Sequence, residues 1–233
     1  MDNLFGDLRL GTLWSTPRAA RRTRATSLQA ATEYTGRLGW TVSVGATAPG
    51  RAPGDAPCEC AAPYCAAPGL HHEVGPELSA GTPAQELAGR CAAGAPLLLP
   101  AGRHFDVLDV PAQAGLQALV RLERMGTQVG PVLAVPTGRL LFFVTPGTAR
   151  QLPELLYRMG WDDAALDLAC HGAGSYVAAP PTVLAGLGAV RWLRRPCRES
   201  AACPPEARLL LGTLAYACHR SRARTAEPAW LAC

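Results

Sequence analysis

The sequence predicts a mixed α/β fold of the α+β kind, in which hairpins accompany alternating strands and helices. Short apolar runs are separated by segments with helical periodicity. Segments 132–135 and 140–144 flank Pro136-Thr137-Gly138, which is typical of a hairpin. Hydrophobic residues make up 48% of the 233 residues and charged residues 17%, enough for a substantial core. Because hairpin strands run antiparallel, we expect a mixed sheet and not a purely parallel one.

The N-terminal part begins with a tail and one helix. Residues 1–26 are interpreted as a flexible basic tail, with an arm that contacts phosphates as the alternative. A short basic run in this tail consists of Arg18, Arg21, Arg22 and Arg24. A helix follows, with Thr26 or Ser27 as its cap and Gly39 at its end. Beyond it the pattern predicts a strand at 40–44, a long Gly/Pro loop at 45–80 and a short helix at 83–93.

The chain from residue 95 onward is more regular. Apolar runs predict strands at 95–99, 105–110, 166–168 and 176–179, and an edge strand at 190–193. Helical periodicity predicts helices at 113–125, 152–159 and 206–220. The residues of the helix 113–125 expected to point inward are Leu116, Leu119, Val120 and Leu122. The resulting division of the chain is a tail at 1–26, a core domain at 27–195 and a C-terminal helical extension at 196–233.

Composition excludes several classes of protein. No stretch approaches the roughly 18 apolar residues of a membrane span. No apolar segment precedes the N-terminal basic cluster, so we expect a cytoplasmic protein without membrane contact. All 22 basic residues are arginine, which together with the abundant alanine, glycine and proline indicates a high-GC bacterium. The net charge of +4 is compatible with nucleic-acid binding but does not by itself indicate it.

The densest group of metal-ligating side chains lies in the loop 45–80. The candidate ligands are Cys58, Cys60 and Cys65, followed by His71 or His72. Structural zinc takes four such ligands, and the metal replaces the core that a loop lacks. Free thiols in a flexible loop 55–75 are the alternative. Nine cysteines, an odd number, argue against a disulfide framework. A second, widely spaced set is interpreted as scattered residues: Cys197, Cys203, Cys218 and His219.

Acidic residues on apolar strands indicate a functional site. Asp106 and Asp109 lie in the strand 105–110, and Asp167 lies in a similar setting at 166–168. A buried carboxylate is costly unless a metal ion or hydrogen-bond donors pair with it. Because strand side chains alternate, Asp106 and Asp109 are expected on opposite faces unless a β-bulge brings them together.

Taken in order, these features resemble a known family. Over roughly residues 27–195 the chain resembles the N-terminal domain of bifunctional DNA primase/polymerases, in the archaeo-eukaryotic primase superfamily. The matching features are a helix running into Gly39-Trp40-Thr41-Val42, the knuckle Cys58/Cys60/Cys65/His71, Val107-Leu108-Asp109-Val110 followed by Gly115, the turn Thr137-Gly138-Arg139, and Asp167 leading to Tyr176-Val177-Ala178-Ala179-Pro180-Pro181. The resemblance implies a two-lobed core with mixed sheets, one lobe similar to an RNA-recognition motif, and His71 as the fourth zinc ligand.

The resemblance also implies a catalytic pattern that this chain matches in part. Asp109 matches the first aspartate of an Asp-x-Asp pair and Asp167 matches a later metal-binding aspartate, whereas Pro111 replaces the second aspartate and Leu140 replaces a phosphate-contacting histidine. The remaining acids imply a site for Mg²⁺ or Mn²⁺ at Asp109 and Asp167, with Asp106 as a degenerate member. The implied contacts to nucleotide phosphates are Thr137, Gly138 and Arg139.

Three functions follow from this partial match. The first is a primase/polymerase-like protein that binds nucleotide, single-stranded DNA or RNA with a weakened or lost nucleotidyltransferase centre. The second is an active Mn²⁺- or Mg²⁺-dependent enzyme using Asp106, Asp109 and Asp167. The third is a zinc-stabilised regulatory or scaffold protein. No phosphate-binding Gly-x4-Gly-Lys-Ser/Thr loop is present, so a helicase would be a separate partner.

Overall fold

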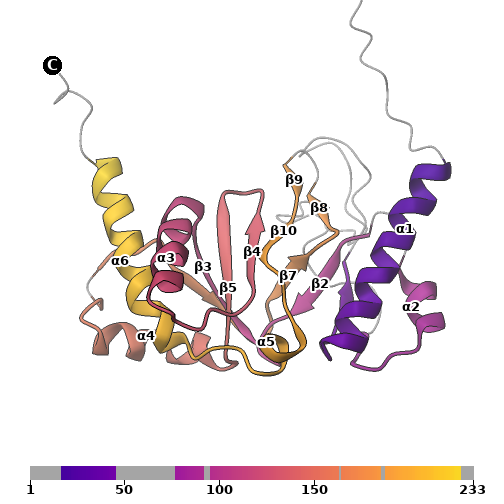
Figure 1. Ribbon diagram of the computed structural model, residues 1–233, viewed down its shortest axis with the longest axis horizontal. Helices are drawn as coiled ribbons and strands as arrows, with labels where there is room; N and C mark the ends of the chain where they lie inside the picture. Colours follow the sequence, from indigo (N-terminus) through magenta and orange to yellow (C-terminus); the bar gives the residue numbers. More distant parts are fainter. Residues whose placement is uncertain (1–16, 46–76, 92–94, 163, 185–186, 227–233) are drawn as a thin grey trace, which may run out of the picture.

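Two β-sheets lie side by side between two groups of helices (Figure 1). The computed structural model describes residues 17–45, 77–91, 95–162, 164–184 and 187–226. The helices are α1 (Pro17–Thr32), a π-helix (Glu33–Arg37), α2 (Ala84–Arg90), α3 (Ala112–Arg124), α4 (Thr148–Arg158), α5 (Arg198–Ala202) and α6 (Ala207–Ala226). The predicted zinc ligands Cys58, Cys60, Cys65 and His71, together with His72, lie outside the described residues.

Every strand pair in the described ranges is antiparallel. The strands are β1 (Ser43–Val44), β2 (Leu97–Pro100), β3 (Asp106–Pro111), β4 (Val132–Val135), β5 (Arg139–Val144), β6 (Ala169–His171), β7 (Tyr176–Ala179), β8 (Val183–Leu184), β9 (Gly188–Ala189) and β10 (Arg191–Arg194). They form a five-stranded sheet of order β10-β4-β5-β3-β6, a three-stranded sheet of order β1-β2-β7 and a small β8-β9 pair. The α/β fold class is confirmed.

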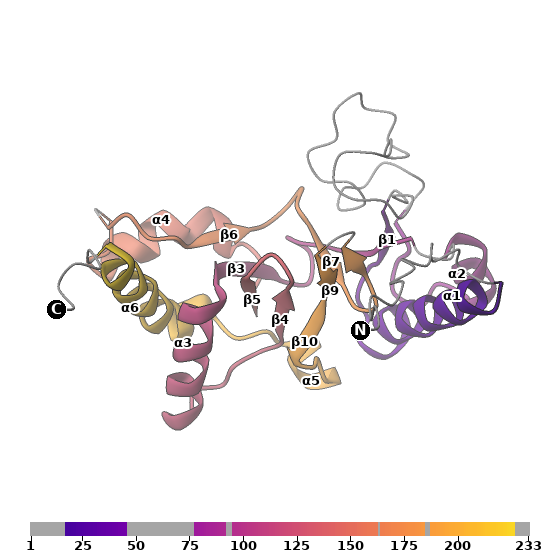
Figure 2. The same cartoon turned by 90° about the horizontal axis from the view of Figure 1, so that it is seen from above.

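The five-stranded sheet separates two cores. Figure 2 shows α3, α4 and α6 on one side of it, and the three-stranded sheet with α1 and α2 on the other. We call the first side the helix-covered face and the second the inner face. Side chains along β3 alternate between them, since Val107 packs in the inner core and Leu108 packs among the helices.

Aromatic side chains of the inner core join the larger lobe, built on the five-stranded sheet, to the smaller lobe, built on the three-stranded sheet. Trp40 packs edge-on against Phe105 and stacks on Phe143, with ring centroids 5.0 and 5.7 Å apart. Trp192, from the edge strand β10, contacts the same Phe143 ring. Such aromatic pairs stabilise a core by about 0.5 to 1.5 kcal/mol beyond the burial of their area. The contacts therefore tie β10 and the segment after the π-helix to the five-stranded sheet.

The second core includes the C-terminal helix. Leu210, Leu211 and Leu214 of α6 are fully buried in one cluster with Leu108 of β3 and Leu122 of α3. Because α6 packs on the sheet in this way, the segment expected as a C-terminal extension forms part of the larger lobe.

Three details differ from the sequence-based expectations. The first helix begins at Pro17, so residues 17–26 are helical and not part of a tail; proline suits a first helical position, and alanine and arginine favour helix. The expected strand 166–168 is wrong, because pairing with β3 selects Ala169–His171 instead. Leu116 and Val120 do not point inward; each is 48% exposed, while Leu119 and Leu122 are buried as predicted.

The hairpin and the edge strand are confirmed. β4 and β5 pair across the turn at 136–138, and β10 lies at the outer edge of the sheet beside β4. The segments expected as helices at 83–93, 113–125, 152–159 and 206–220 each contain a helix, with ends shifted by a few residues.

Candidate functional site

Four polar side chains gather at one end of the inner face, from β3, β5, β6 and the segment before β6. Asp109 follows Val107 by two positions on β3 and therefore shares its face. It lies opposite Leu141, another residue of the inner core, in the register between β3 and β5. We call the group of Asp109, Arg139, Asp167 and His171 the carboxylate–arginine cluster.

Arg139 joins two carboxylates in this cluster. Its Nε donates to Asp109 Oδ1 at 2.7 Å, its Nη1 donates to Asp167 Oδ1 at 2.8 Å, and its Nη2 donates to the Asp109 carbonyl at 3.3 Å. The hairpin turn places Arg139, because Gly138 there adopts a φ of 82°, which suits glycine. The Gly138 carbonyl also accepts from the Ala112 N–H, which fixes the turn against the start of α3.

His171 completes the cluster from β6. Its Nε2 lies 2.9 Å from Oδ2 of Asp109, so each Asp109 oxygen has a partner. The register pairs Val107 with His171, which puts the imidazole on the inner face beside Asp109. His171 was not among the predicted site residues, because the spacing Asp167-x3-His171 does not by itself show which histidine reaches Asp109.

The electrostatics of the cluster follow from these contacts. Burial by itself raises the pKa of Asp109, but the hydrogen bonds from His171 and Arg139 and their charges outweigh burial, so the pKa lies below its usual range. Burial by itself lowers the pKa of Arg139, but the bonds to Asp109 and Asp167 outweigh it and raise the pKa. The contacts therefore favour the ionised forms of Asp109 and Arg139.

Asp106 lies on the other face of the sheet, away from the cluster. It is 1% exposed, and its Oδ2 accepts the backbone N–H of Ala149 at 2.7 Å in the first turn of α4. Gly147, at the N-cap of α4, has no side chain to satisfy that donor, so Asp106 does so from β3. Asp106 therefore does not join Asp109 and Asp167 at one site, and the expectation that it and Asp109 occupy opposite faces is confirmed.

The two replaced family positions have different surroundings. Pro111 lies cross-strand from Arg139, so the guanidinium comes from the position opposite the missing second aspartate. Leu140 is 2% exposed and packs among the helices, and a Cβ on Gly115 of α3 would lie 2.9 Å from its Cδ1. Leu140 therefore points away from Asp109. The imidazole that lies beside Asp109 is that of His171, on a different strand.

The carboxylates do not fit Mg²⁺ or Mn²⁺ in this arrangement. Both oxygens of Asp109 are engaged, and the guanidinium of Arg139 lies between Asp109 and Asp167. Divalent cations of this kind need several free oxygen ligands around one point. Within the described ranges, no group of three or more His, Cys, Asp or Glu side chains comes together as a metal site.

The comparison with protein families identifies the domain that carries this cluster. Residues 31–206 match the family model described as bifunctional DNA primase/polymerase, N-terminal, and that range includes all four residues of the cluster. The chain belongs to this family. The comparisons with curated proteins and with solved structures give no match. Among the described helices of this primase/polymerase domain, none combines the length and apolar character needed to cross a bilayer.

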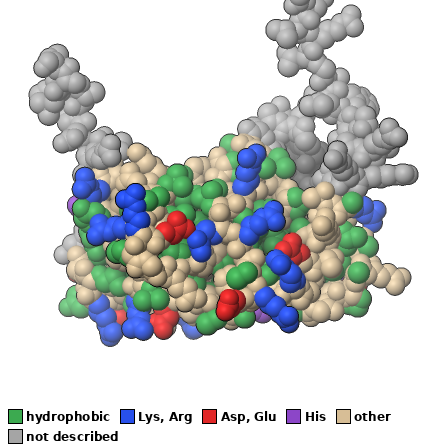
Figure 3. Space-filling model, viewed as in Figure 1, with side chains coloured by type: hydrophobic (Ala, Val, Ile, Leu, Met, Phe, Trp, Pro, Cys, Tyr) green, Lys and Arg blue, Asp and Glu red, His purple; other side chains and the backbone are tan. Residues whose placement is uncertain are grey.

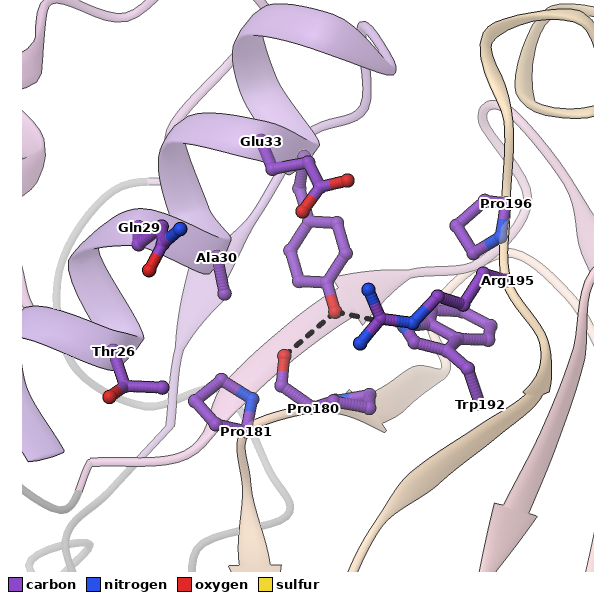
Figure 4. A pocket seen from close by; sticks show the side chains of 10 residues that line it. Thr26, Gln29, Ala30, Glu33, Pro180, Pro181, Trp192, Arg195 and Pro196 are labelled. Carbon is purple, nitrogen blue, oxygen red and sulfur yellow. Dashed lines mark hydrogen bonds between the residues drawn. The ribbon is translucent and has the colours of Figure 1, made fainter.

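A pocket of about 220 Å³ opens at the other edge of the sheet in this primase/polymerase domain, between α1, β10 and Pro180–Pro181. The Tyr34 hydroxyl at its wall donates to the Pro180 carbonyl at 2.7 Å and accepts from Trp192 Nε1 at 3.2 Å (Figure 4). Figure 4 shows the Arg195 side chain turned toward this wall. Burial raises the pKa of Tyr34 to about 12, although the bond from Trp192 opposes this. The lining thus combines apolar side chains with the polar Thr26 and Gln29, the carboxylate of Glu33 and the exposed guanidinium of Arg195.

Sequence reasoning thus found some residues of the site and missed others. The predicted phosphate contact Arg139 is held by two carboxylates, and its neighbour Thr137 is exposed at the hairpin turn. Asp109 and Asp167 are brought together as expected, but through an arginine. The pocket beside Arg195 was not predicted, because its residues come from three distant segments and carry no shared motif.

Proposed function

We propose that this primase/polymerase domain binds nucleotide or single-stranded nucleic acid and does not transfer nucleotides. The observation that carries the proposal is the guanidinium of Arg139 between Asp109 and Asp167. Two-metal phosphoryl transfer requires carboxylate oxygens that converge on shared cations. In this chain the cationic partner of both carboxylates is a side chain, and the third acid, Asp106, caps a helix on the opposite face.

The pocket beside Arg195 supports the binding half of the proposal. Pro180, Pro181 and Trp192 give it flat apolar walls, and Arg195 adds a guanidinium that suits a phosphate. Its volume of about 220 Å³ suits a single ring and not a whole nucleotide. We therefore expect one base or ribose to enter, with the phosphates remaining outside near Arg195.

The first experiment measures synthesis. Wild-type protein is incubated with primed and unprimed single-stranded templates, dNTPs or NTPs, and Mg²⁺ or Mn²⁺, beside the variant Asp109→Ala/Asp167→Ala. We expect no incorporation above that variant. Incorporation by wild type that the double variant loses would overturn the proposal and establish the active enzyme.

The second experiment measures binding through thermal stability, since a ligand that binds the native state raises it. Nucleotides are added to wild type, to Arg195→Ala and to the control Arg198→Ala, an exposed arginine outside the pocket. We expect stabilisation of wild type and of the control that Arg195→Ala loses. No stabilisation by any nucleotide, with or without Mg²⁺ or Mn²⁺, would favour the zinc-stabilised scaffold.

Structural zinc at Cys58, Cys60, Cys65 and His71 remains a separate proposal, carried by the spacing of these ligands alone. Elemental analysis of protein purified without chelator tests it, with about one zinc per chain expected. His72 is the alternative fourth ligand, and the variants His71→Ala and His72→Ala distinguish the two by which one lowers the zinc content.

A further inference from the structure

The outer surface of α3 and α6 carries a groove that the proposed function does not use. It consists of two hollows, of about 290 and 500 Å³, that share Arg121, Thr213 and Tyr216. Because α3 and α6 cover the helix-covered face, the groove faces away from the inner face and its carboxylate–arginine cluster. Figure 3, seen from the same side as Figure 1, shows basic side chains at the end of the molecule that these helices form.

Two arginines share one aromatic ring in this groove. The guanidinium carbon of Arg121, from α3, lies 5.6 Å from the centroid of the Tyr216 ring, and that of Arg220 lies 5.9 Å from it. Nη1 of Arg220 also donates to the Tyr216 hydroxyl at 3.3 Å. These cation–π contacts hold both cations in place before any ligand arrives, which lowers the entropy cost of binding.

Among the described residues, two of the three arginines of the groove lack acidic counterparts. In the part of the chain that the structure describes, the linings of the two hollows together include Arg121, Arg208 and Arg220 and no aspartate or glutamate. Arg208 pairs with Glu206, but within the described residues neither Arg121 nor Arg220 forms an ion pair. Two guanidinium groups beside one ring repel each other, and an anion that binds both relieves this repulsion.

We propose that the α3–α6 groove binds the phosphate backbone of single-stranded DNA. Basic side chains interleaved with exposed aromatic rings are the features by which proteins hold single strands without reading their sequence. Tyr216 is 42% exposed, and Trp161 lines the neighbouring hollow, so each hollow offers a ring beside its arginines. The chain belongs to a family of DNA primase/polymerases, which makes DNA the polyanion to test first. This surface is distinct from the pocket of the proposed function.

The test uses the full-length protein and a fluorescein-labelled oligo(dT) in a salt series, with binding followed by fluorescence anisotropy. The groove variant is Arg121→Ala/Arg220→Ala. Its control, Arg90→Ala/Arg150→Ala, removes the same charge at exposed arginines on α2 and α4, outside the groove. We expect the groove variant to bind at least about tenfold more weakly than the control. The slope of log affinity against log salt should fall by about 1.4, since each single-strand phosphate contact contributes about 0.7.

A second pair of variants tests the groove by adding a charge at an exposed position, so that the conclusion does not depend on whether the double arginine variant folds. Gln117→Glu adds a negative charge inside the groove, and Gln151→Glu makes the same change at an exposed position on α4. We expect weaker oligonucleotide binding for Gln117→Glu alone. Equal binding by the groove variants and their controls at matched salt would overturn the proposal, as would a wild-type protein that does not bind the oligonucleotide.

The groove and the Arg195 pocket can fail separately. Nucleotide-induced stabilisation is measured on the same groove variants, and we expect it to be unchanged. Loss of DNA binding with intact nucleotide stabilisation supports the groove. DNA binding that is unchanged in the groove variants but lost in Arg195→Ala would instead place the strand at the pocket and overturn this proposal.

Discussion

The two surfaces of the larger lobe use arginine in opposite ways. In the carboxylate–arginine cluster, Arg139 is 25% exposed and its guanidinium is shared between Asp109 and Asp167. In the α3–α6 groove, Arg121 and Arg220 contact an aromatic ring and, among the residues that the structure describes, no carboxylate. A cation matched by acids holds the protein's own chain together, whereas a cation without them is free to attract an anion from outside.

This difference also bears on the chemistry that the family resemblance implies. The family motifs indicate where the acidic residues lie in the chain. Whether these acids can bind a metal ion depends on the side chains that pair with them in the folded protein. Arg139 lies directly cross-strand from Pro111, so the position facing the lost aspartate supplies a positive charge. We infer that the cluster keeps a role in joining β3, β5 and the segment before β6.

Among the charged side chains, the largest expected effect comes from Asp106→Ala, which tests whether the third acid belongs to the packing of the helices and not to the cluster. The change leaves the part-buried N–H of Ala149 without its acceptor, so the free energy of unfolding should fall by about 1 to 3 kcal/mol. Urea unfolding measures it. The exposed control Asp162→Ala should change the stability by less than about 0.5 kcal/mol. Equal effects would contradict the assignment of Asp106 to the first turn of α4.

Arg139→Ala should convert the cluster into a cation site. Without the guanidinium, Asp109 and Asp167 repel each other, and the unfolding free energy should fall by about 1 to 2 kcal/mol. Mn²⁺ should then bind at least about tenfold more tightly than to wild type, because two carboxylates and His171 become available. Electron paramagnetic resonance of free Mn²⁺ measures the binding, with Arg150→Ala as control. An unchanged Mn²⁺ affinity would show that the arginine does not stand in for a metal.

The pH dependence of stability tests the pairing of Asp109. Its pKa is lower in the folded protein than the usual 3.8, so the folded state binds the proton more weakly than the unfolded chain does. The resulting stabilisation is fully present above about pH 4 and is lost as the pH falls through the lowered pKa. Asp109→Asn should therefore flatten the fall in melting temperature below pH 4, whereas an unchanged acid limb would argue against the ion pair.

The smallest expected effect concerns the outer face of α3. Leu116→Gln should change the stability by less than about 0.5 kcal/mol, since Leu116 is 48% exposed. Leu122→Ala, at a fully buried position of the same helix, should lower it by about 2 to 5 kcal/mol. Thermal or urea unfolding distinguishes them. A large loss for Leu116→Gln would mean that another surface covers this face, which would also bear on access to the groove.

The sequence by itself determined the fold class, the hairpin around Gly138, the buried stripe of Leu119 and Leu122, and the alternation that separates Asp106 from Asp109. These features depend on periodicity and turn chemistry, which are local. The family was also accessible, because its motifs keep their order along the chain.

Only the tertiary structure determined which of these residues contact one another. Strand pairing brought His171 to Asp109, the hairpin register brought Arg139 between two acids, and the packing of α6 on α3 brought Arg220 and Arg121 to one ring. The residues in each pair are separated by dozens of positions, and no local pattern encodes such distances. Contacts of this kind arise only when burial of the two cores fixes the strands and helices against one another.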